Sequence, residues 1–206
     1  MTQTASPFDP RSPEDVARLL QHQPLGWIVS GAGETARATV LPLRPVLDAE
    51  GKIVRLQGHM SRNNPQAAAL REDPSALILL LGPHGYISPS WMADRSQAPT
   101  WNYASAQFLV DVSLIDDAEG LQAHLRDLVG AMEADRPNAW SVEEMGARYE
   151  SLSRRIVGFD ARVLETRARF KLGQDERDDV FADILGGLER EGASALLAWM
   201  REFDGR

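Results

Sequence analysis

The spacing of apolar residues changes several times along the chain, and each change predicts a new element. At the start, apolar residues at helical spacing follow Ser12-Pro13, a hydroxyl cap with proline at the first helical position. This predicted helix ends before Pro24. Short β-branched segments separated by turns then predict three strands, at 26–30, 38–43 and 53–59.

The middle of the chain combines a helix with core strands. Asn64-Pro65 predicts the start of a short helix that continues to about Glu72. Two apolar runs, 76–81 and 108–115, predict buried strands.

The last part of the chain is predicted to be mostly helical. After Asp116, apolar residues recur along one helical face, at Leu121, Leu125, Leu128 and Met132. Ser141 and Glu144 form a capping-box pattern that predicts another helix. A long strand is predicted at 159–172, and two closing helices follow, at 175–190 and 194–203.

Short strands of antiparallel type interrupted by helices indicate the α+β class, with a barrel as the expected form of the sheet. The sequence contains no repeat, low-complexity tract or interdomain linker. Residues 1–206 are therefore predicted to form a single domain, with C-terminal helices at about 175–203 packed on it.

Composition narrows the class of function. With 22 basic and 30 acidic side chains the formal net charge is −8, which argues against direct DNA binding by phosphate neutralisation. Cysteine is absent, which excludes disulfides, thiolate chemistry and cysteine-bound metals and fits a cytoplasmic location. The apolar runs are too short to span a membrane, so no membrane association is expected.

A strand-to-helix junction at 58–66 is the first candidate site. His59 and Arg62 come immediately before the helix start at Asn64. Because free backbone N–H groups at a helix N-terminus attract anions, this arrangement predicts a phosphate site. The same pattern is also compatible with a capped helix, a solvent-facing Arg62 and a hydrogen-bonded structural His59.

An aromatic segment at 86–103 is the second candidate site, and it holds four of the eight Trp and Tyr residues in the chain. Ser, Thr and Asn lie between the rings, and such a segment can stack on a planar ligand and hydrogen-bond its edges. A packing cluster or a subunit interface would have the same composition.

Three further features have simpler interpretations. Asp175, Asp179 and Asp183 share one helical face, which we interpret as solvated acids near a helix N-terminus and not as a metal site. Residues 31–33 lack the features of a dinucleotide-binding loop and predict a hairpin turn. Nothing local assigns a role to residues 171–174.

Three stretches together resemble the PaiB-type family of FMN-binding split-barrel proteins. They are H-x-x-R-x-N-P-Q from His59, the pair Y-I-S-P-S-W and P-T-W-N-Y from Tyr86 and Pro99, and K-L-x-Q from Lys171. Their order and spacing match the family over residues 8–190 or so. The aromatic pair is the most specific part of the resemblance.

The resemblance implies a split β-barrel related to pyridoxamine-phosphate oxidase-like flavoproteins, assembled as a homodimer with FMN at the subunit interface. The phosphate is expected near Arg62 and the 64–66 helix start, and the ring against part of 86–103. The implied cofactor-binding residues are His59, Arg62, Asn64, Ser88, Ser90, Trp91, Trp101, Asn102, Tyr103, Lys171 and Gln174.

Members of the family are described as negative transcriptional regulators, and the acidic charge suggests that such regulation is indirect, through another protein or a metabolite. Val40 and Gln107 stand where the family has histidines. Two alternatives are therefore kept: a flavin-dependent oxidoreductase on a small substrate, and a partner-binding protein with a vestigial flavin pocket. Another planar ligand, such as haem bound through His59, is an alternative to FMN.

Overall fold

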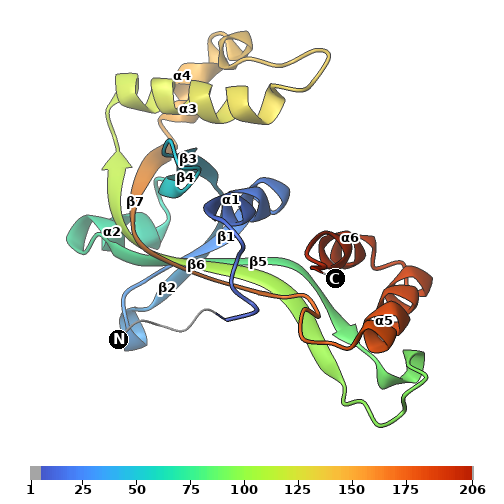
Figure 1. Ribbon diagram of the computed structural model, residues 1–206. Helices are drawn as coiled ribbons and strands as arrows, with labels where there is room; N and C mark the ends of the chain where they lie inside the picture. Colours follow the sequence, from blue (N-terminus) through green and yellow to red (C-terminus); the bar gives the residue numbers. More distant parts are fainter. Residues whose placement is uncertain (1–5, 206) are drawn as a thin grey trace.

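Residues 6–205 are described by a computed structural model with one seven-stranded sheet and six α-helices (Figure 1). The strands are β1 Leu25–Ser30, β2 Arg37–Pro42, β3 Arg44–Leu47, β4 Ile53–Ser61, β5 Ser75–Ile87, β6 Thr100–Ile115 and β7 Ile156–Lys171. The α-helices are α1 Pro13–His22, α2 Pro65–Glu72, α3 Ala118–Glu133, α4 Arg148–Ser153, α5 Asp178–Arg190 and α6 Ser194–Glu202, and the 3₁₀ turns are η1 Gly33–Thr35, η2 Pro89–Trp91 and η3 Val142–Met145. The predicted α+β class is confirmed.

The sheet curls into a split β-barrel, as the resemblance implied. Neighbours in the order β2-β1-β5-β6-β7-β4-β3 are all antiparallel. β2 is one edge of this order and β4 is next to the other, yet the two strands meet. A Cβ added to Gly58 in β4 would lie only 2.8 Å from the carbonyl oxygen of Pro42 in β2.

The central strands are longer than the apolar runs that predicted them. β5 continues to Ile87 through a Gly-Pro pair, and β6 already begins at Thr100, within the aromatic segment. A register shift after Leu81 absorbs the turn-like residues, and pairing resumes at His84 opposite Tyr103. The residues beyond the predicted strand end at position 81 therefore form the outer part of a long β5–β6 hairpin.

Two of the three helix starts predicted from capping residues are confirmed as α-helices. Ser12 and Asp15 form a capping box at the start of α1, and the Asn64 Oδ1 accepts a hydrogen bond from the Gln66 N–H (3.0 Å) at the start of α2. α2 also ends at Glu72, as predicted.

The helical unit between β6 and β7 (residues 118–153) stands beside the barrel (Figure 1). α3 forms as predicted, but most of its apolar face is open, and Met132 is 52% exposed. The capping box at Ser141 begins a 3₁₀ turn and not the predicted longer helix, because Gly146 turns the chain with a φ of +53° before α4 begins.

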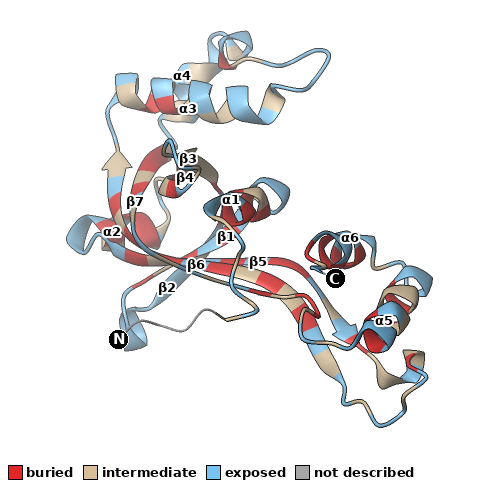
Figure 2. Cartoon of the chain, in the orientation of Figure 1, coloured by how far each residue is buried: buried red, intermediate tan, exposed pale blue. Residues whose placement is uncertain are grey.

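The C-terminal helices cover the outer part of the β5–β6 hairpin. One cluster of buried apolar residues extends from the barrel interior to α5 and α6, whereas most of residues 118–153 is exposed (Figure 2). Trp199 and Phe203 stack in parallel at the C-terminal end of this cluster (centroids 5.7 Å apart). The predicted helix at 175–190 begins three residues late, at Asp178, because a turn with Gly173 at φ +85° precedes it.

Candidate functional site

The junction between β4 and α2 is a closed network of hydrogen bonds. The amide nitrogen of the Asn64 side chain donates to the Thr39 hydroxyl in β2 (3.1 Å). The buried Gln66 amide donates to the Ile28 carbonyl (3.0 Å), with further contacts to the Ser30 hydroxyl and the Arg37 carbonyl. These side chains join α2 to the barrel at the level of β1 and β2.

The backbone N–H groups of this junction are already satisfied, which corrects the basis of the phosphate prediction. The N–H of Arg62 donates to the Arg155 carbonyl, and those of Asn63 and Asn64 donate to the Ser61 hydroxyl and carbonyl. The first N–H groups of α2 donate to Asn64. An anion would therefore bind here through side chains and the local charge, and not through free backbone donors.

Arg62 contributes to a positively charged cluster. Its guanidinium donates to Asp116 (2.6 Å) and to the Ile156 carbonyl (2.9 Å), so it holds the junction to the start of β7. Arg71 donates to both oxygens of the same Asp116 (2.8 and 3.0 Å). Because two guanidinium groups share one carboxylate, the cluster keeps one positive charge beside the junction.

His59 lies on the outer face of β4, and its Nδ1 is buried without a hydrogen-bond partner among residues 6–205. Burial lowers the pKa of this imidazole, and the neighbouring His124 lowers it further. His124 is on the buried side of α3, where its Nε2 contacts the Gly58 carbonyl (2.7 Å), and burial lowers its pKa as well. Both imidazoles are thus biased toward the neutral form.

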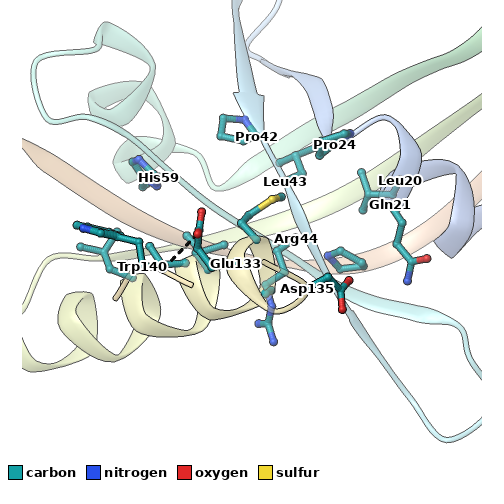
Figure 3. Close-up of a pocket in the computed structure, with 16 residues that line it drawn as sticks. Leu20, Gln21, Pro24, Pro42, Leu43, Arg44, His59, Glu133, Asp135 and Trp140 are labelled. Carbon is teal, nitrogen blue, oxygen red and sulfur yellow. Dashed lines mark hydrogen bonds between the residues drawn. The ribbon is translucent and has the colours of Figure 1, made fainter. Parts of the chain in front are cut away.

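A cleft of about 790 Å³ opens between α3 and the barrel, and His59 lines it (Figure 3). One wall is the open face of α3, with Leu125, Leu128 and Met132, and Trp140 lies near it. The residues of the facing wall come from the end of α1 and from β2 and β3: Leu20, Gln21, Pro24, Pro42, Leu43, Arg44 and Pro45. The volume lies within the range of small-molecule sites.

The aromatic segment lies at the outer end of the β5–β6 hairpin. Trp101 is 55% exposed and meets Tyr86, its partner in the strand register, edge to face with centroids 5.9 Å apart. Trp91 is half-buried against Gly187 of α5. Asn102 is buried and its amide approaches the Met200 sulfur (3.5 Å), so its place in this chain is structural.

The other predicted residues of this end mostly make local contacts. The Ser88 hydroxyl accepts a hydrogen bond from the Ser90 N–H (3.1 Å), while the Ser90 side chain is exposed. Lys171 donates to the Thr100 hydroxyl and pairs with the half-buried Tyr103 in the β6–β7 register. Lys171 thereby belongs to the same end of the hairpin as the aromatic rings.

Gln174 closes its own turn. Its side-chain oxygen accepts from the Leu172 N–H (2.8 Å) and its amide nitrogen donates to the Phe170 carbonyl (2.6 Å). Both hydrogen-bonding ends are used, which gives Gln174 a structural role that its sequence context did not reveal.

The predicted site residues therefore form two groups at opposite ends of the molecule. α2 is joined to β1 at Ile28, which pairs with Ile78 in β5, and the aromatic group begins eight residues further along β5, at Tyr86. Eight strand residues span about 25 Å. Figure 1 shows α2 and the end of the β5–β6 hairpin on opposite sides of the barrel, so side chains of the two groups do not meet within one chain.

The predicted acidic face is only partly formed, because α5 begins at Asp178 and Asp175 lies before it. The other two acids make local contacts. Asp179 pairs with Arg177 (2.9 Å), and Asp183 accepts a hydrogen bond from the Ala93 N–H (2.7 Å). Within the described part of the chain, no three His, Asp or Glu side chains are arranged to hold a metal ion.

Comparison with known proteins identifies the family. A family model described as "Putative FMN-binding domain" matches residues 3–165, more than three quarters of the chain. The chain belongs to this FMN-binding family. The match ends before Lys171 and Gln174, so these two residues rest on the PaiB-type resemblance alone.

A curated relative agrees with the family match. This chain is 27% identical over 185 residues to "Protease synthase and sporulation protein PAI 2" of Bacillus subtilis, covering 89% of this chain and 87% of the relative. This similarity confirms the resemblance to the PaiB-type family.

Solved structures with TM-scores above 0.5 show the same fold. An FAD- and haem-binding protein from Mycobacterium smegmatis has a TM-score of 0.61 at 20% identity, covering 87% of this chain and 80% of that one. A flavocytochrome from Azotobacter vinelandii has a TM-score of 0.58 at 18% identity, covering 79% and 69%. Between residues 6 and 205, no helix is long and apolar enough to cross a membrane.

Proposed function

We propose that this protein binds FMN as a homodimer, with each flavin held between the β4–α2 junction of one copy and the aromatic end of the β5–β6 hairpin of the other. The observation that carries this proposal is the separation of the two residue groups by about 25 Å. In a dimer with a two-fold axis across the hairpin, the junction of each copy meets the aromatic hairpin end of the other copy. Two equivalent sites are formed in this way.

An exposed apolar face supports the pairing. Trp27 is 52% exposed and lies opposite Val40 and Leu79 in the β2-β1-β5 register. The exposed large apolar residues on strands β1, β2, β5, β6 and β7 are Leu25, Trp27, Val40, Leu79, Leu81, Tyr86, Trp101, Leu109 and Leu164. Exposure of such an apolar surface to water is unfavourable in a monomer, whereas a second copy would bury it.

The side chains at the junction fit the polar part of FMN. Ser61 and Asn63 are exposed beside the residual positive charge of the Arg62–Arg71–Asp116 cluster, which favours a phosphate. His59 provides an imidazole with an unused nitrogen between the junction and the open cleft. The exposed Trp101 of the second copy provides a ring for stacking.

Bound FMN would supply electron-transfer chemistry, and the protein would position it and exclude water. The reaction of an oxidoreductase would show as bleaching of the bound flavin by NADH or NADPH, with recovery in air. Absence of bleaching with both donors would instead favour a binding or regulatory protein.

The name of the Bacillus relative refers to protease synthesis and sporulation, and the family resemblance implies negative transcriptional regulation, which we propose is indirect for this chain. The net charge of −8 opposes contact with DNA phosphates, so we expect regulation through a bound metabolite or another protein. A salt-sensitive gel shift with a specific promoter fragment would contradict this expectation.

Mixed dimers test the shared site. Asn63→Glu places an exposed negative charge at the junction, and Trp101→Ala removes an exposed ring at the other end, so neither disturbs the core. Each variant alone should lose FMN, measured by flavin absorbance retained after desalting. Refolded together in equal amounts, they should recover about one quarter of the sites, because half of the dimers are mixed and each has one intact site.

The same experiment separates the other arrangements. If the site lay within one chain, the mixture would recover nothing. If the hairpin end were irrelevant to FMN, Trp101→Ala alone would bind normally. Light scattering on each sample checks that both variants remain dimers.

A further inference from the structure

The cleft between α3 and the barrel has features that the flavin proposal does not use. Flavin binding as proposed requires the junction and the outer hairpin end, whereas the cleft extends from His59 toward α1 and the helical unit of residues 118–153. We propose that this cleft is a separate site for an uncharged small molecule with an aromatic or polycyclic body. His59 is the one residue that both proposals use, and the rest of the cleft does not depend on whether FMN is bound.

The walls of the cleft suit an apolar, flat ligand. Leu125, Leu128 and Met132 line the cleft on the α3 side, and Pro24, Pro42 and Pro45 line it on the barrel side. Leu20 and Leu43 lie behind the barrel side and are buried, and Trp140 lies at one side of the opening (Figure 3). Met132 is 52% exposed and Trp140 is 38% exposed. A ligand that covers these side chains would remove apolar surface from water on both sides at once.

The cleft is open in the single chain, because one end of α3 packs on the barrel and the other end stands away from it. Leu121 and His124 of α3 pack against Gly158 of β7. A Cβ on Gly158 would lie 3.0 Å from the His124 ring, so a larger residue at that position would push this end of α3 away. The contact of His124 with the Gly58 carbonyl holds the same end. Towards Met132 the helix stands away from the barrel, and the space between them is the cleft.

The charges around the cleft are balanced, which selects an uncharged ligand. Arg44 donates to Gln57 (2.8 Å) and contributes one positive charge. Asp135 has no partner among the described residues and contributes one negative charge, while Glu133 is paired with Arg136 (3.3 Å). Because these charges cancel, the rim offers no net attraction to an ion of either sign, whereas burying an ionised ligand costs free energy.

His59 supplies a neutral polar group to the cleft, in addition to the exposed Gln21. Its Nδ1 has no partner in the described chain, and its lowered pKa keeps the imidazole neutral at pH 7. That nitrogen is buried, so rotation of the ring toward the cleft would be needed for a ligand N–H or O–H to satisfy it. The ligand class is therefore an apolar ring system with one hydrogen-bond donor.

N-phenyl-1-naphthylamine is a matching probe, since it is uncharged, aromatic and has one N–H. We expect it to bind the dimer with one molecule per chain, detected by its fluorescence and by energy transfer from Trp140, which Trp140→Phe would remove. Leu128→Arg should weaken binding by more than about tenfold, because it charges the apolar wall. Leu152→Arg, on the exposed surface of α4 outside the cleft, is the matched control and should bind normally.

Two further measurements define the ligand. 8-anilinonaphthalene-1-sulfonate, which is the same probe with a sulfonate, should bind about tenfold more weakly. His59→Phe should weaken the uncharged probe by about fivefold, the effect of one hydrogen bond.

Several outcomes would overturn the proposal. Equal loss in Leu128→Arg and Leu152→Arg, or no saturable binding, would exclude the cleft as a site. Equal or tighter binding of the sulfonate would exclude the uncharged class. Stoichiometric displacement of the probe by FMN would assign the cleft to the flavin, whereas probe binding to a protein that does not bind FMN would leave this proposal intact and overturn only the flavin proposal.

Discussion

Gln66 shows how one residue of a recognisable motif can serve the fold. Its side chain is completely buried and joins α2 to the backbone of β1 and β2, while its Oε1 has no partner within residues 6–205. In the sequence, Gln66 is only the last letter of the H-x-x-R-x-N-P-Q stretch. Its effect on flavin binding would therefore come through the position of the junction.

Replacing Gln66 by leucine should reduce the free energy of unfolding by about 1–3 kcal/mol, because the carbonyls of Ile28 and Arg37 would lose a buried donor. Urea denaturation followed by circular dichroism measures this change. Gln23→Leu, at an exposed position after α1, is the control and should change stability by less than about 0.5 kcal/mol. Equal stability of the two variants would show that the Gln66 hydrogen bonds contribute nothing.

The two buried imidazoles predict a loss of stability in mild acid. Burial lowers the pKa of His59 and of His124 below the ordinary value of 6.5, so the unfolded chain binds protons more readily than the folded one. Their contribution is complete above about pH 6.5 and is lost as the pH falls below that value toward the folded-state pKa values. Unfolding midpoints between pH 7.5 and 5 should therefore fall, and His124→Gln should make the decrease shallower.

At the scale of elements, helices were predictable where the chain itself carries their ends. Asn64-Pro65 set the start of α2 and Asp73-Pro74 its end, because caps and prolines act on neighbouring residues. The full length of the long strands was not predictable. Pairing with distant strands holds residues such as Pro83 in β5 despite their preference for turns. The capping box at Ser141 predicted a helix start correctly but not the length of the helix.

α5 packs on the aromatic segment without any gap at Gly187. A Cβ there would lie 2.3 Å from the indole of Trp91. Gly187→Ala should therefore destabilise the protein by about 1–3 kcal/mol and shift Trp91, detected by thermal unfolding and tryptophan fluorescence.

The neighbouring glycine provides the matched control. A Cβ on Gly186 would contact only the flexible end of Arg190 (3.3 Å), so Gly186→Ala should be neutral or stabilising by up to about 1 kcal/mol, as alanine favours the helix. If both variants behaved alike, helix propensity would outweigh the packing of α5 on Trp91.

For the whole molecule, the open sheet face predicts the oligomeric state. Trp27→Asp places a charge at the centre of this face, where the side chain is already 52% exposed in one chain, so folding should be preserved. The variant should be a monomer by light scattering and should lose FMN with the dimer. Leu152 is also apolar and exposed but lies on α4, so the Leu152→Asp variant should remain a dimer. A dimeric Trp27→Asp protein would place the interface elsewhere.

The parts of the site could be predicted from sequence better than their arrangement. Arg62, Asn64 and Trp101 were identified as residues because their motifs are local. Their separation depends on the length of β5, and the cleft depends on how α3 meets Gly158, which no local pattern records. Distances between elements are set by packing across the whole chain, so they became visible only in the fold.

The separation of the β4–α2 junction from the aromatic end of the β5–β6 hairpin has a consequence for regulation in the cell. A site completed by a second copy exists only while two copies are together, so flavin occupancy would follow the amount of protein as well as the amount of flavin. Dilution would release the cofactor at a fixed FMN concentration, and synthesis of more chain would recapture it. The fraction of chains with bound flavin would therefore rise with the concentration of the protein, with a threshold set by the strength of subunit association.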